Sequence, residues 1–191
     1  MFTMKDICIE GNPLLREKCV KVKFPLTQDD ENLIKELLQY VIISENDELV
    51  KQFNIRPGVG IAAPQVGSNK RMFAMNCTDF LSEKQEKYCF ALINPEILAV
   101  SEELVYLPDG EGCLSVERDT NKMVTPRHLA IKFKAAIYDF KTGKVKNVTK
   151  TFTGYPAIVF QHEYDHLDGI LFVDKLFKRE EAPGEPLFTY E

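Results

Sequence analysis

The residues with the clearest chemistry in this chain are two histidines, His162 and His166, with Glu163 directly after the first of them. On a helix, residues four positions apart lie on the same face, so two imidazoles at this spacing can bind one metal ion. The glutamate between them can reach a water molecule on that ion and take its proton. The pattern H-E-x-x-H therefore predicts a metal-dependent hydrolase.

A catalytic metal site usually has three protein ligands and one open position, so a third ligand must come from elsewhere in the chain. Asp168 and Asp174 lie downstream of the motif, whereas the third histidine, His128, lies upstream with no motif around it. The stronger candidate is Cys113, because the glycines that flank its approach let the backbone come close to another group. A lone buried cysteine is more often a small core residue, so this assignment depends on further motifs.

A glycine-rich segment, G-V-G-I-A-A-P-Q at residues 58–65, is the next candidate for function. It approaches the dinucleotide-binding spacing G-x-G-x-x-G/A, with Ala63 at the last position. However, it follows a loop, and no acidic residue stands clearly about twenty positions later. We favour a different interpretation, in which the backbone of this segment lies against a peptide substrate and Gln65 is directed into the site.

Composition narrows the class of protein. The chain has 191 residues, of which 45% are hydrophobic and 28% charged, so we predict one catalytic domain over residues 1–191. A net charge of -5 argues against a general affinity for nucleic acid or for an anionic membrane. Five cysteines without a C-x-x-C pair, and an N-terminal segment without the apolar core of a signal peptide, predict a cytoplasmic protein with reduced thiols.

Three helices are predicted. A short one begins at Asn12, followed by Pro13 at its first position. An amphipathic helix begins at its cap, Thr27, and ends near Ser44, because apolar residues recur at helical spacing behind an acidic first turn. The helix that carries H-E-x-x-H is expected to begin around Gly154 and Pro156 and to end at Gly169.

The chain beyond Pro57 is predicted to be mostly strands, at residues 71–76, 88–94 and 129–140, with a hairpin turn at 141–144. Helices and strands are grouped along the chain and do not alternate, which predicts the α+β class. We expect antiparallel sheets packed around a central helix that carries the H-E-x-x-H motif. The tail after Lys178 does not follow a helical pattern and is expected to be extended.

Taken together, the motifs resemble those of the peptide deformylases. The family pattern is G-x-G-x-A-A-x-Q, E-G-C-x-S and Q-H-E-x-D-H, and all of its fixed positions occur in this order at residues 58–65, 111–115 and 161–166. The long segment before the first motif, the insert at residues 78–109 and the non-helical tail are similar to the type II branch of Gram-positive bacteria.

This resemblance implies an enzyme of the bacterial cytoplasm that removes the formyl group from the N-terminal formylmethionine of nascent peptides. It implies Cys113, His162 and His166 as metal ligands and Glu163 as general acid and base. It implies one divalent ion, Fe2+ in the cell, with Zn2+, Ni2+ or Co2+ able to occupy the site. The ribosome is a second candidate partner, although the lysines of the tail are balanced by acidic residues.

The chemistry of the reaction fits the residues. A formamide is an unreactive acyl group, so the attacking water must be activated by the metal. We expect the side-chain amide of Gln65 and the backbone N–H of Leu114 to stabilise the developing oxyanion, with one such donor worth about 3 kcal/mol. A thiolate ligand also makes the site sensitive to oxidation.

Substrate selection is expected to depend on a backbone edge and a pocket. Val59, Gly60 and Gly112 would offer backbone groups to an extended peptide, in the manner of an added strand. The resemblance implies a pocket for the methionine side chain, and ordinary core packing is the alternative role for its residues. The predicted pocket residues are Val59, Leu114, Tyr155, Ile158 and Val159.

Four polar residues are expected to support the site. Glu111 and Arg127 would pair beside the Cys113 loop, and Gln161 and Asp165 would orient the imidazoles. Two other functions were weighed. An H-E-x-x-H endopeptidase is disfavoured by the Cys113 motif and by the small single domain, and a non-catalytic binding protein is disfavoured because Glu163 and Gln65 are both present.

Overall fold

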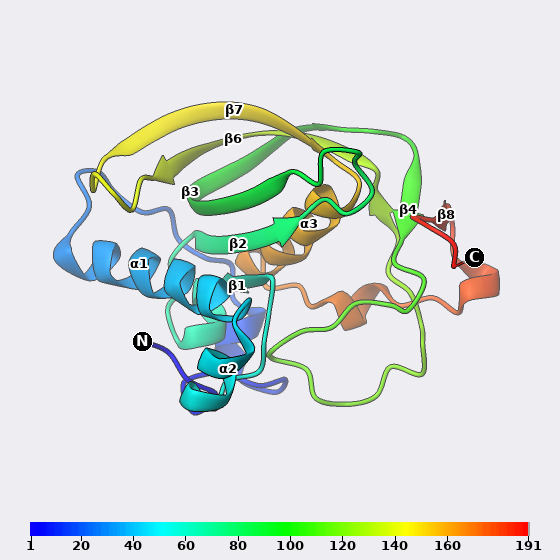
Figure 1. Cartoon of the computed structure of the whole chain (residues 1–191), viewed down its shortest axis with the longest axis horizontal. Helices are drawn as coiled ribbons and strands as arrows, with labels where there is room; N and C mark the ends of the chain where they lie inside the picture. The colour runs from blue at the N-terminus through cyan, green and yellow to red at the C-terminus, as the bar shows by residue number, and fades with distance from the viewer. Residues whose placement is uncertain (191) are drawn as a thin grey trace.

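The computed structural model describes residues 1–190, so the last residue of the predicted tail lies outside the described part. The fold is α+β, as predicted, with two β-sheets and three α-helices among the described residues (Figure 1). The α-helices are α1 (Gln28–Ile43), α2 (Asp47–Phe53) and α3 (Tyr155–Leu167). Short 3-10 helices are η1 (Pro13–Arg16), η2 (Ala63–Val66), η3 (Phe172–Lys175) and η4 (Arg179–Glu181).

The larger sheet has five strands in the order β1-β2-β3-β6-β7, and every neighbouring pair is antiparallel. Its strands are β1 (Gly60–Ala62), β2 (Met72–Thr78), β3 (Lys87–Val100), β6 (Ala130–Tyr138) and β7 (Val145–Thr153). The glycine-rich segment therefore forms the edge strand β1 and then enters η2, and the outer side of β1 has no neighbouring strand in the described sheet. The hairpin predicted at residues 141–144 joins β6 to β7.

The smaller sheet has three strands in the order β5-β4-β8, and it differs in one respect from the prediction of antiparallel sheets. The strands are β4 (Leu104–Tyr106), β5 (Arg127–His128) and β8 (Glu185–Pro186). The C-terminal strand β8 pairs with β4 in parallel. The tail is extended only in part, because it begins with the 3-10 helix η4. After that helix it runs parallel to β4 and joins the smaller sheet.

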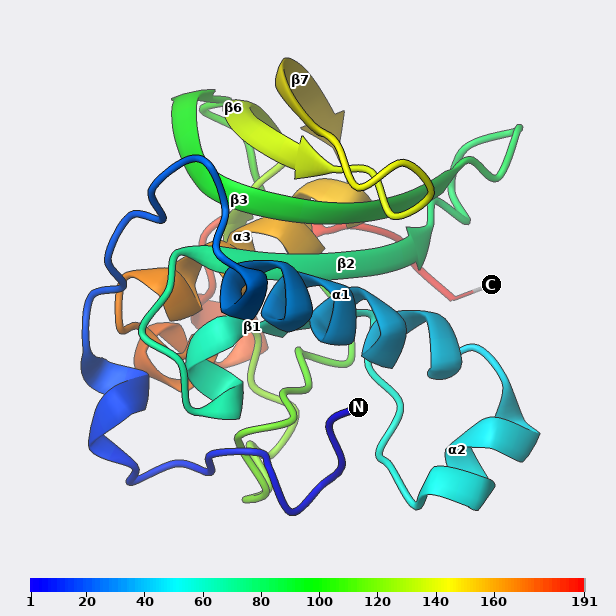
Figure 2. The same cartoon turned by 90° about the vertical axis from the view of Figure 1, so that its left-hand side faces the viewer.

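The larger sheet is covered on both faces next to β1 and β2. Side chains alternate along β2: Met72 and Ala74 belong to the apolar cluster with α1, whereas Phe73 and Met75 belong to the cluster with α3. The two helices therefore pack against opposite faces of the sheet (Figure 2). This arrangement explains why β2 is apolar along its whole length and does not alternate with polar residues.

Local signals in the sequence account for the helix boundaries. Thr27 and Asp30 form a capping box at the start of α1, and Gly154 and Pro156 begin α3. Gly169 follows α3 with φ +74°, and a Cβ there would lie 2.5 Å from the backbone oxygen of Arg16. The glycine therefore permits both the turn and the close approach.

Two differences from the predictions have a clear reason. Helix α2 was not predicted, and it buries none of its residues, so it leaves no apolar periodicity to detect. Strand β3 continues beyond the predicted residue 94 through Pro95, with register shifts after Ile93. A bulge accommodates a proline in a sheet. Among the described helices, none combines the length and the apolar character needed to cross a membrane.

Candidate active site

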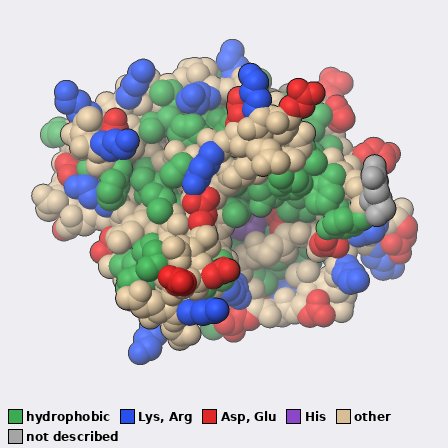
Figure 3. All heavy atoms as spheres, in the orientation of Figure 1, with side chains coloured by type: hydrophobic (Ala, Val, Ile, Leu, Met, Phe, Trp, Pro, Cys, Tyr) green, Lys and Arg blue, Asp and Glu red, His purple; other side chains and the backbone are tan. Residues whose placement is uncertain are grey.

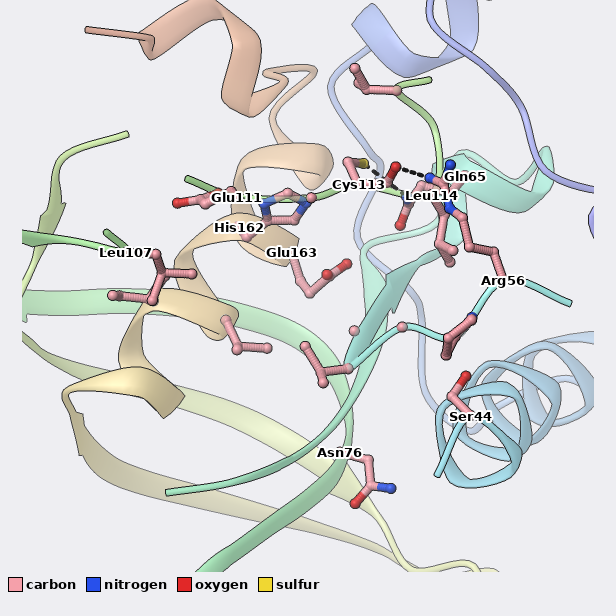
Figure 4. Close-up of a pocket in the computed structure, with 18 of the residues that line it drawn as sticks. Ser44, Arg56, Gln65, Asn76, Leu107, Glu111, Cys113, Leu114, His162 and Glu163 are labelled. Carbon is pink, nitrogen blue, oxygen red and sulfur yellow. Dashed lines mark hydrogen bonds and ion pairs between the residues drawn. The ribbon is translucent and has the colours of Figure 1, made fainter. Parts of the chain in front are cut away.

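The candidate residues meet in a cavity of about 470 Å³ bounded by β1, α3 and the loop at residues 111–114. One face of the molecule is hollowed there, with a histidine visible inside and hydrophobic side chains along the rim (Figure 3). All of the predicted catalytic, metal-binding and substrate-binding residues except His166 line this cavity, and His166 lies buried beside Cys113. Figure 4 shows His162 and Glu163 projecting from α3 towards the segments that carry Cys113, Leu114 and Gln65.

Three side chains form the one group of potential metal ligands found among the described residues. The ligand atoms of Cys113, His162 and His166 all lie within 4.8 Å of one another. Cys113 Sγ is 3.4 Å from His166 Nε2. Tetrahedral bonding, with about 2.3 Å to sulfur and about 2.1 Å to nitrogen, places two such ligand atoms about 3.6 Å apart. The donor set and its spacing therefore fit one transition-metal ion.

His162 is oriented by a carboxylate. Its Nδ1 lies 2.7 Å from Glu111 Oε2, which directs Nε2 towards the cavity. Burial lowers the pKa of His162, but the Cys113 sulfur and the Glu111 carboxylate outweigh burial and raise that pKa well above its usual value. The same two groups would favour a metal cation in place of the proton.

Glu111 keeps its charge because Arg127 lies against it. The guanidinium binds the carboxylate through two hydrogen bonds of 2.8 and 2.9 Å, and the Arg127 side chain is 2% exposed. Burial alone would raise the pKa of Glu111, but Arg127 and His162 bring it down to about 2. The predicted pair of Glu111 and Arg127 is confirmed, and it does more than support the loop, because Glu111 also holds His162.

His166 is a neutral imidazole in this environment. Burial, with a contribution from His162, lowers its pKa well below the usual value. A neutral imidazole is the form that binds a metal ion. Its Nδ1 is buried and has no hydrogen-bond partner within residues 1–190, so Nε2, beside Cys113, is the nitrogen that faces the other donors.

Glu163 lies next to the cluster and has the properties of a general base. It is 4% exposed, and burial raises its pKa to about 7. Its Oε2 is buried and makes no hydrogen bond to any described residue. A carboxylate with this pKa can take a proton and give it back near neutral pH.

Gly60 makes room for Glu163. A Cβ built on Gly60 would lie 2.2 Å from Glu163 Oε1, closer than any side chain permits. Glycine at this position of β1 therefore allows the carboxylate to lie against the strand. This steric role was not predicted from the sequence, which indicated a backbone contact with substrate.

Gln65 is held so that its amide nitrogen faces the sulfur. Its Oε1 accepts a hydrogen bond of 2.8 Å from the backbone N–H of Ala62. Its Nε2 then donates towards Ser115 Oγ at 3.1 Å and Cys113 Sγ at 3.4 Å. Leu114 lies on the same loop, whose Cys113 carbonyl accepts a hydrogen bond from the Arg56 side chain.

The predicted pocket residues lie on two sides of the cavity. Ile158 and Val159 line it from α3 and are almost fully buried, whereas Val59 on the opposite side is 41% exposed. The carbonyl of Val59 accepts a hydrogen bond of 2.7 Å from Asn76. The N–H of Val59 has no backbone partner in the described part of the chain, so this group is free to bind a peptide.

Two predicted supporting contacts are wrong. Gln161 binds the backbone N–H and carbonyl of His128 at 3.0 and 2.8 Å, so it joins α3 to β5 and orients no imidazole. Asp165 binds Arg127 and Lys175. The motif does not reveal either partner, because both lie outside it in the sequence.

The alternative ligands are engaged elsewhere. Asp168 pairs with Arg71 at 2.9 Å, and Asp174 pairs with Arg16. His128 lies in β5 with Nδ1 2.6 Å from the Ser101 carbonyl. The sequence analysis did not single out Arg56 or Ser115, although Ser115 belongs to the E-G-C-x-S pattern. Arg56 has no local signal, because its contact is with a loop more than fifty residues away.

Known proteins are similar to this chain in sequence and in architecture. Residues 4–182 match the model of the polypeptide deformylase family. A peptide deformylase of Halalkalibacterium halodurans is 44% identical over 190 residues, which cover 96% of this chain and 100% of that protein. Peptide deformylase 2 of Bacillus anthracis is 42% identical over 178 residues, covering 93% of this chain and 92% of that protein. The crystal structure of the Thermotoga maritima peptide deformylase aligns with a TM-score of 0.63 and 34% identity, covering 90% of this chain and 96% of that one.

Proposed function

The chain belongs to the polypeptide deformylase family, and from that premise we propose that Cys113, His162 and His166 hold one divalent metal ion beside Glu163. The enzyme removes the formyl group from the N-terminal formylmethionine of newly synthesised polypeptides. The observation that carries the proposal is the meeting of three donor atoms beside a buried carboxylate whose pKa is raised to about 7. An ion held by these three side chains would lower the pKa of a bound water molecule and so make it a nucleophile near neutral pH.

Glu163 moves the proton in this proposal. Its carboxylate takes a proton from the attacking water and passes it to the amine that leaves. Gly60 lets the carboxylate stay beside the edge strand, and burial keeps its pKa in the range where both transfers are possible. Glu163 binds no metal in this scheme, because Cys113 and the two histidines complete the protein's donor set.

Gln65 and Leu114 are proposed to bind the oxyanion. The contact between Ala62 and Gln65 Oε1 leaves the Gln65 amide nitrogen as the donor that faces the site. The backbone N–H of Leu114 follows directly after the proposed ligand Cys113 and is the second donor. Donors held in place before the reaction stabilise the developing charge without reorganisation.

Replacement of Glu163 by Gln tests the proton transfer. The variant is expected to keep its metal and to lose about 10²–10⁴-fold in kcat, the usual contribution of general acid–base catalysis. Formate release from a formyl-Met tripeptide and metal content are measured together. Glu102→Gln, at an exposed position, is the matched control. Near-normal turnover by Glu163→Gln would show that another group handles the proton.

The cavity is proposed to accept the methionine side chain between Val59 and the α3 residues Ile158 and Val159. An apolar pocket discriminates one methylene by about 1–3 kcal/mol, so formyl-norleucine is expected to replace formyl-Met and formyl-Ala to be poor. A charged side chain would be buried unpaired and rejected. Equal kcat/KM for formyl-Asp and formyl-Met peptides would contradict this pocket. Efficient cleavage of an acetyl-Met peptide would contradict the proposal that the site beside the metal, Gln65 and Leu114 accepts only a formyl group.

Iron is the proposed metal in the cell. A thiolate with two imidazoles suits several divalent metals, so the donor set alone does not select one. The family resemblance favours ferrous iron, and a thiolate beside it explains sensitivity to oxygen. We expect protein isolated without oxygen to contain iron and to be more active per metal ion than a zinc-loaded form. An equally active zinc form, with no iron in the gently isolated protein, would contradict this.

The domain organisation of the enzyme, its location in the cell and its contact with the ribosome are also proposals. We propose that residues 1–191 form one catalytic domain in the bacterial cytoplasm, because β1 and α3 contribute to one site and pack in one set of layers. Since its substrates are nascent peptides, brief contact with the ribosome is expected. Co-sedimentation of the enzyme with ribosomes that carry formylated nascent chains tests that contact. No co-sedimentation with these ribosomes would contradict it.

A further inference from the structure

Three aromatic side chains from distant parts of the chain pack in a row that begins at the wall of the cavity. Phe80 lies in the turn between β2 and β3, Tyr155 begins α3, and Phe188 belongs to the C-terminal tail. The ring centroids of Phe80 and Tyr155 are 5.1 Å apart, and those of Phe80 and Phe188 are 5.4 Å apart. Both distances are those of favourable aromatic pairs. The rings connect the insert at residues 78–109 and the tail to the helix that carries the site.

The tail that carries Phe188 is fixed to the body of the protein. Strand β8 pairs with β4, and the N–H of Leu187 donates a 2.8 Å hydrogen bond to the Tyr106 carbonyl. Gly184 has φ +91°, and a Cβ there would lie 2.2 Å from the Leu104 oxygen, so the glycine lets the tail approach β4. Phe188 is therefore presented to Phe80 from a backbone that is held in place.

Tyr155 is the far wall of the cavity on the α3 side. The cavity is lined from α3 by His162, Val159, Ile158 and Tyr155. Tyr155 precedes His162 by seven positions, a rise of about 10 Å along the helix. A side chain that enters from the metal end therefore meets Ile158 and Val159 first and Tyr155 last.

The outer side of this wall depends on Phe80. Backbone hydrogen bonds, such as that from the Asp79 N–H to the Glu86 carbonyl, hold the turn that carries Phe80. The Phe80 side chain itself is 46% exposed and packs against the rings of Tyr155 and Phe188. Removal of Phe188 would leave one side of Phe80 without a partner. The Phe80 ring, and with it the support behind Tyr155, would then be free to change its rotamer.

We propose that Phe188 and Phe80 are positioning residues that hold Tyr155 against the cavity and thereby limit the length of the first side chain that the enzyme accepts. The inference rests on the proposed function of the cavity as the methionine pocket. Neither residue lines the cavity, so both act through Tyr155. The tail and the insert would then set specificity and leave the chemistry at the metal end unchanged.

The test compares two peptides that differ in the first side chain only: formyl-Met and formyl-2-aminooctanoate, whose linear side chain is longer. Phe188→Ala and Phe80→Ala in the full-length, metal-loaded enzyme are each expected to raise kcat/KM for the longer substrate relative to formyl-Met by about tenfold, the low end for one methylene in an apolar pocket. The change should appear in KM, with kcat for formyl-Met within twofold of the parent. The double variant should match the single ones, because the two rings act in series.

Controls separate this role from general stabilisation. Phe140→Ala removes a phenylalanine that is 54% exposed in the turn between β6 and β7, and it should leave the ratio unchanged. Phe188→Tyr should keep the parent ratio. If Phe188→Ala fails to fold, Phe188→Leu serves the same comparison. An unchanged ratio in the folded Phe188 and Phe80 variants, or an equal loss of kcat on both peptides, would overturn the inference. Failure of the parent enzyme to release formate would instead overturn the proposed function.

Discussion

Three nitrogen atoms lie around the Cys113 sulfur. The backbone N–H of Ser115, the amide nitrogen of Gln65 and His166 Nε2 all lie 3.4 Å from its sulfur. Ser115 and Gln65 direct N–H groups at the sulfur, and cysteine binds a metal ion as its thiolate. These contacts hold the sulfur beside the two histidines, so Cys113 links the loop at 111–114 to the proposed metal site.

Replacement of Cys113 by Ala is therefore expected to abolish stoichiometric metal binding, because two imidazoles on one helix leave the ion with too few protein ligands. Metal content after dialysis measures the effect. Cys89→Ala, at an exposed cysteine in β3, is the matched control and should bind metal like the parent. Full occupancy in Cys113→Ala would remove Cys113 from the site.

Substitution of Gly60 is expected to lower turnover as strongly as substitution of a catalytic residue. Gly60→Ala places a methyl group where Glu163 Oε1 now lies, so the carboxylate must turn away or β1 must shift. A displacement of about 1 Å at a catalytic group costs about 10²-fold in rate. We expect that loss in kcat, with metal content unchanged. Normal turnover would mean that Glu163 does not work from its position against β1.

At the scale of elements, a buried ion-pair network joins β5, α3 and the Cys113 loop. Arg127 of β5 binds Glu111 in the loop and Asp165 in α3, and Lys175 binds Asp165 from the other side at 2.8 Å. Glu111 in turn holds His162. The helix that carries the histidines and the loop that carries the cysteine are thus positioned by the same arginine.

Loss of Arg127 should be costly for stability. Arg127→Ala leaves Glu111 and Asp165 without their buried partner, and breaking such a pair typically costs about 3–5 kcal/mol. The free energy of unfolding from urea titration measures this cost. Arg118→Ala, which breaks the more exposed pair with Glu10, should cost about 1 kcal/mol or less. Equal costs in the two variants would contradict a special role for the network.

At the scale of the whole molecule, metal binding should stabilise the fold. The three proposed ligands come from a loop and from α3, about fifty residues apart in the chain, and an unfolded chain does not keep them together. Free metal at a thousandfold excess over its Kd contributes about 4 kcal/mol. For a protein of this size, that corresponds to a rise in Tm of about 10 °C.

Thermal unfolding of chelated and reloaded protein checks this expectation, with Cys113→Ala as the variant that should show no shift. Identical Tm values for the chelated and reloaded parent protein would mean that the three side chains do not bind metal in the folded state. The Arg127→Ala variant separates the effect of the ion-pair network from the effect of the metal. Arg127→Ala should lower the Tm of both forms, because its network does not require the metal.

The sequence by itself determined the features that depend on neighbouring residues. The i, i+4 spacing of His162 and His166, the cap at Thr27 and the turn after β6 are local patterns, and the structure contains the corresponding helices and hairpin. Three motifs in order also placed the chain in its family and indicated which residues meet. A local pattern is readable because short-range geometry is the same in every helix or hairpin.

Only the tertiary structure decided which side chains the candidate residues touch. Glu111 holds His162, Asp165 binds Arg127, and Gly60 makes space for Glu163. The two residues of each pair are far apart in the sequence. Phe188 reaches Phe80 because β8 returns along β4. Such contacts depend on the packing of whole elements and on the face from which each side chain leaves, and neither leaves a periodic signal in the chain.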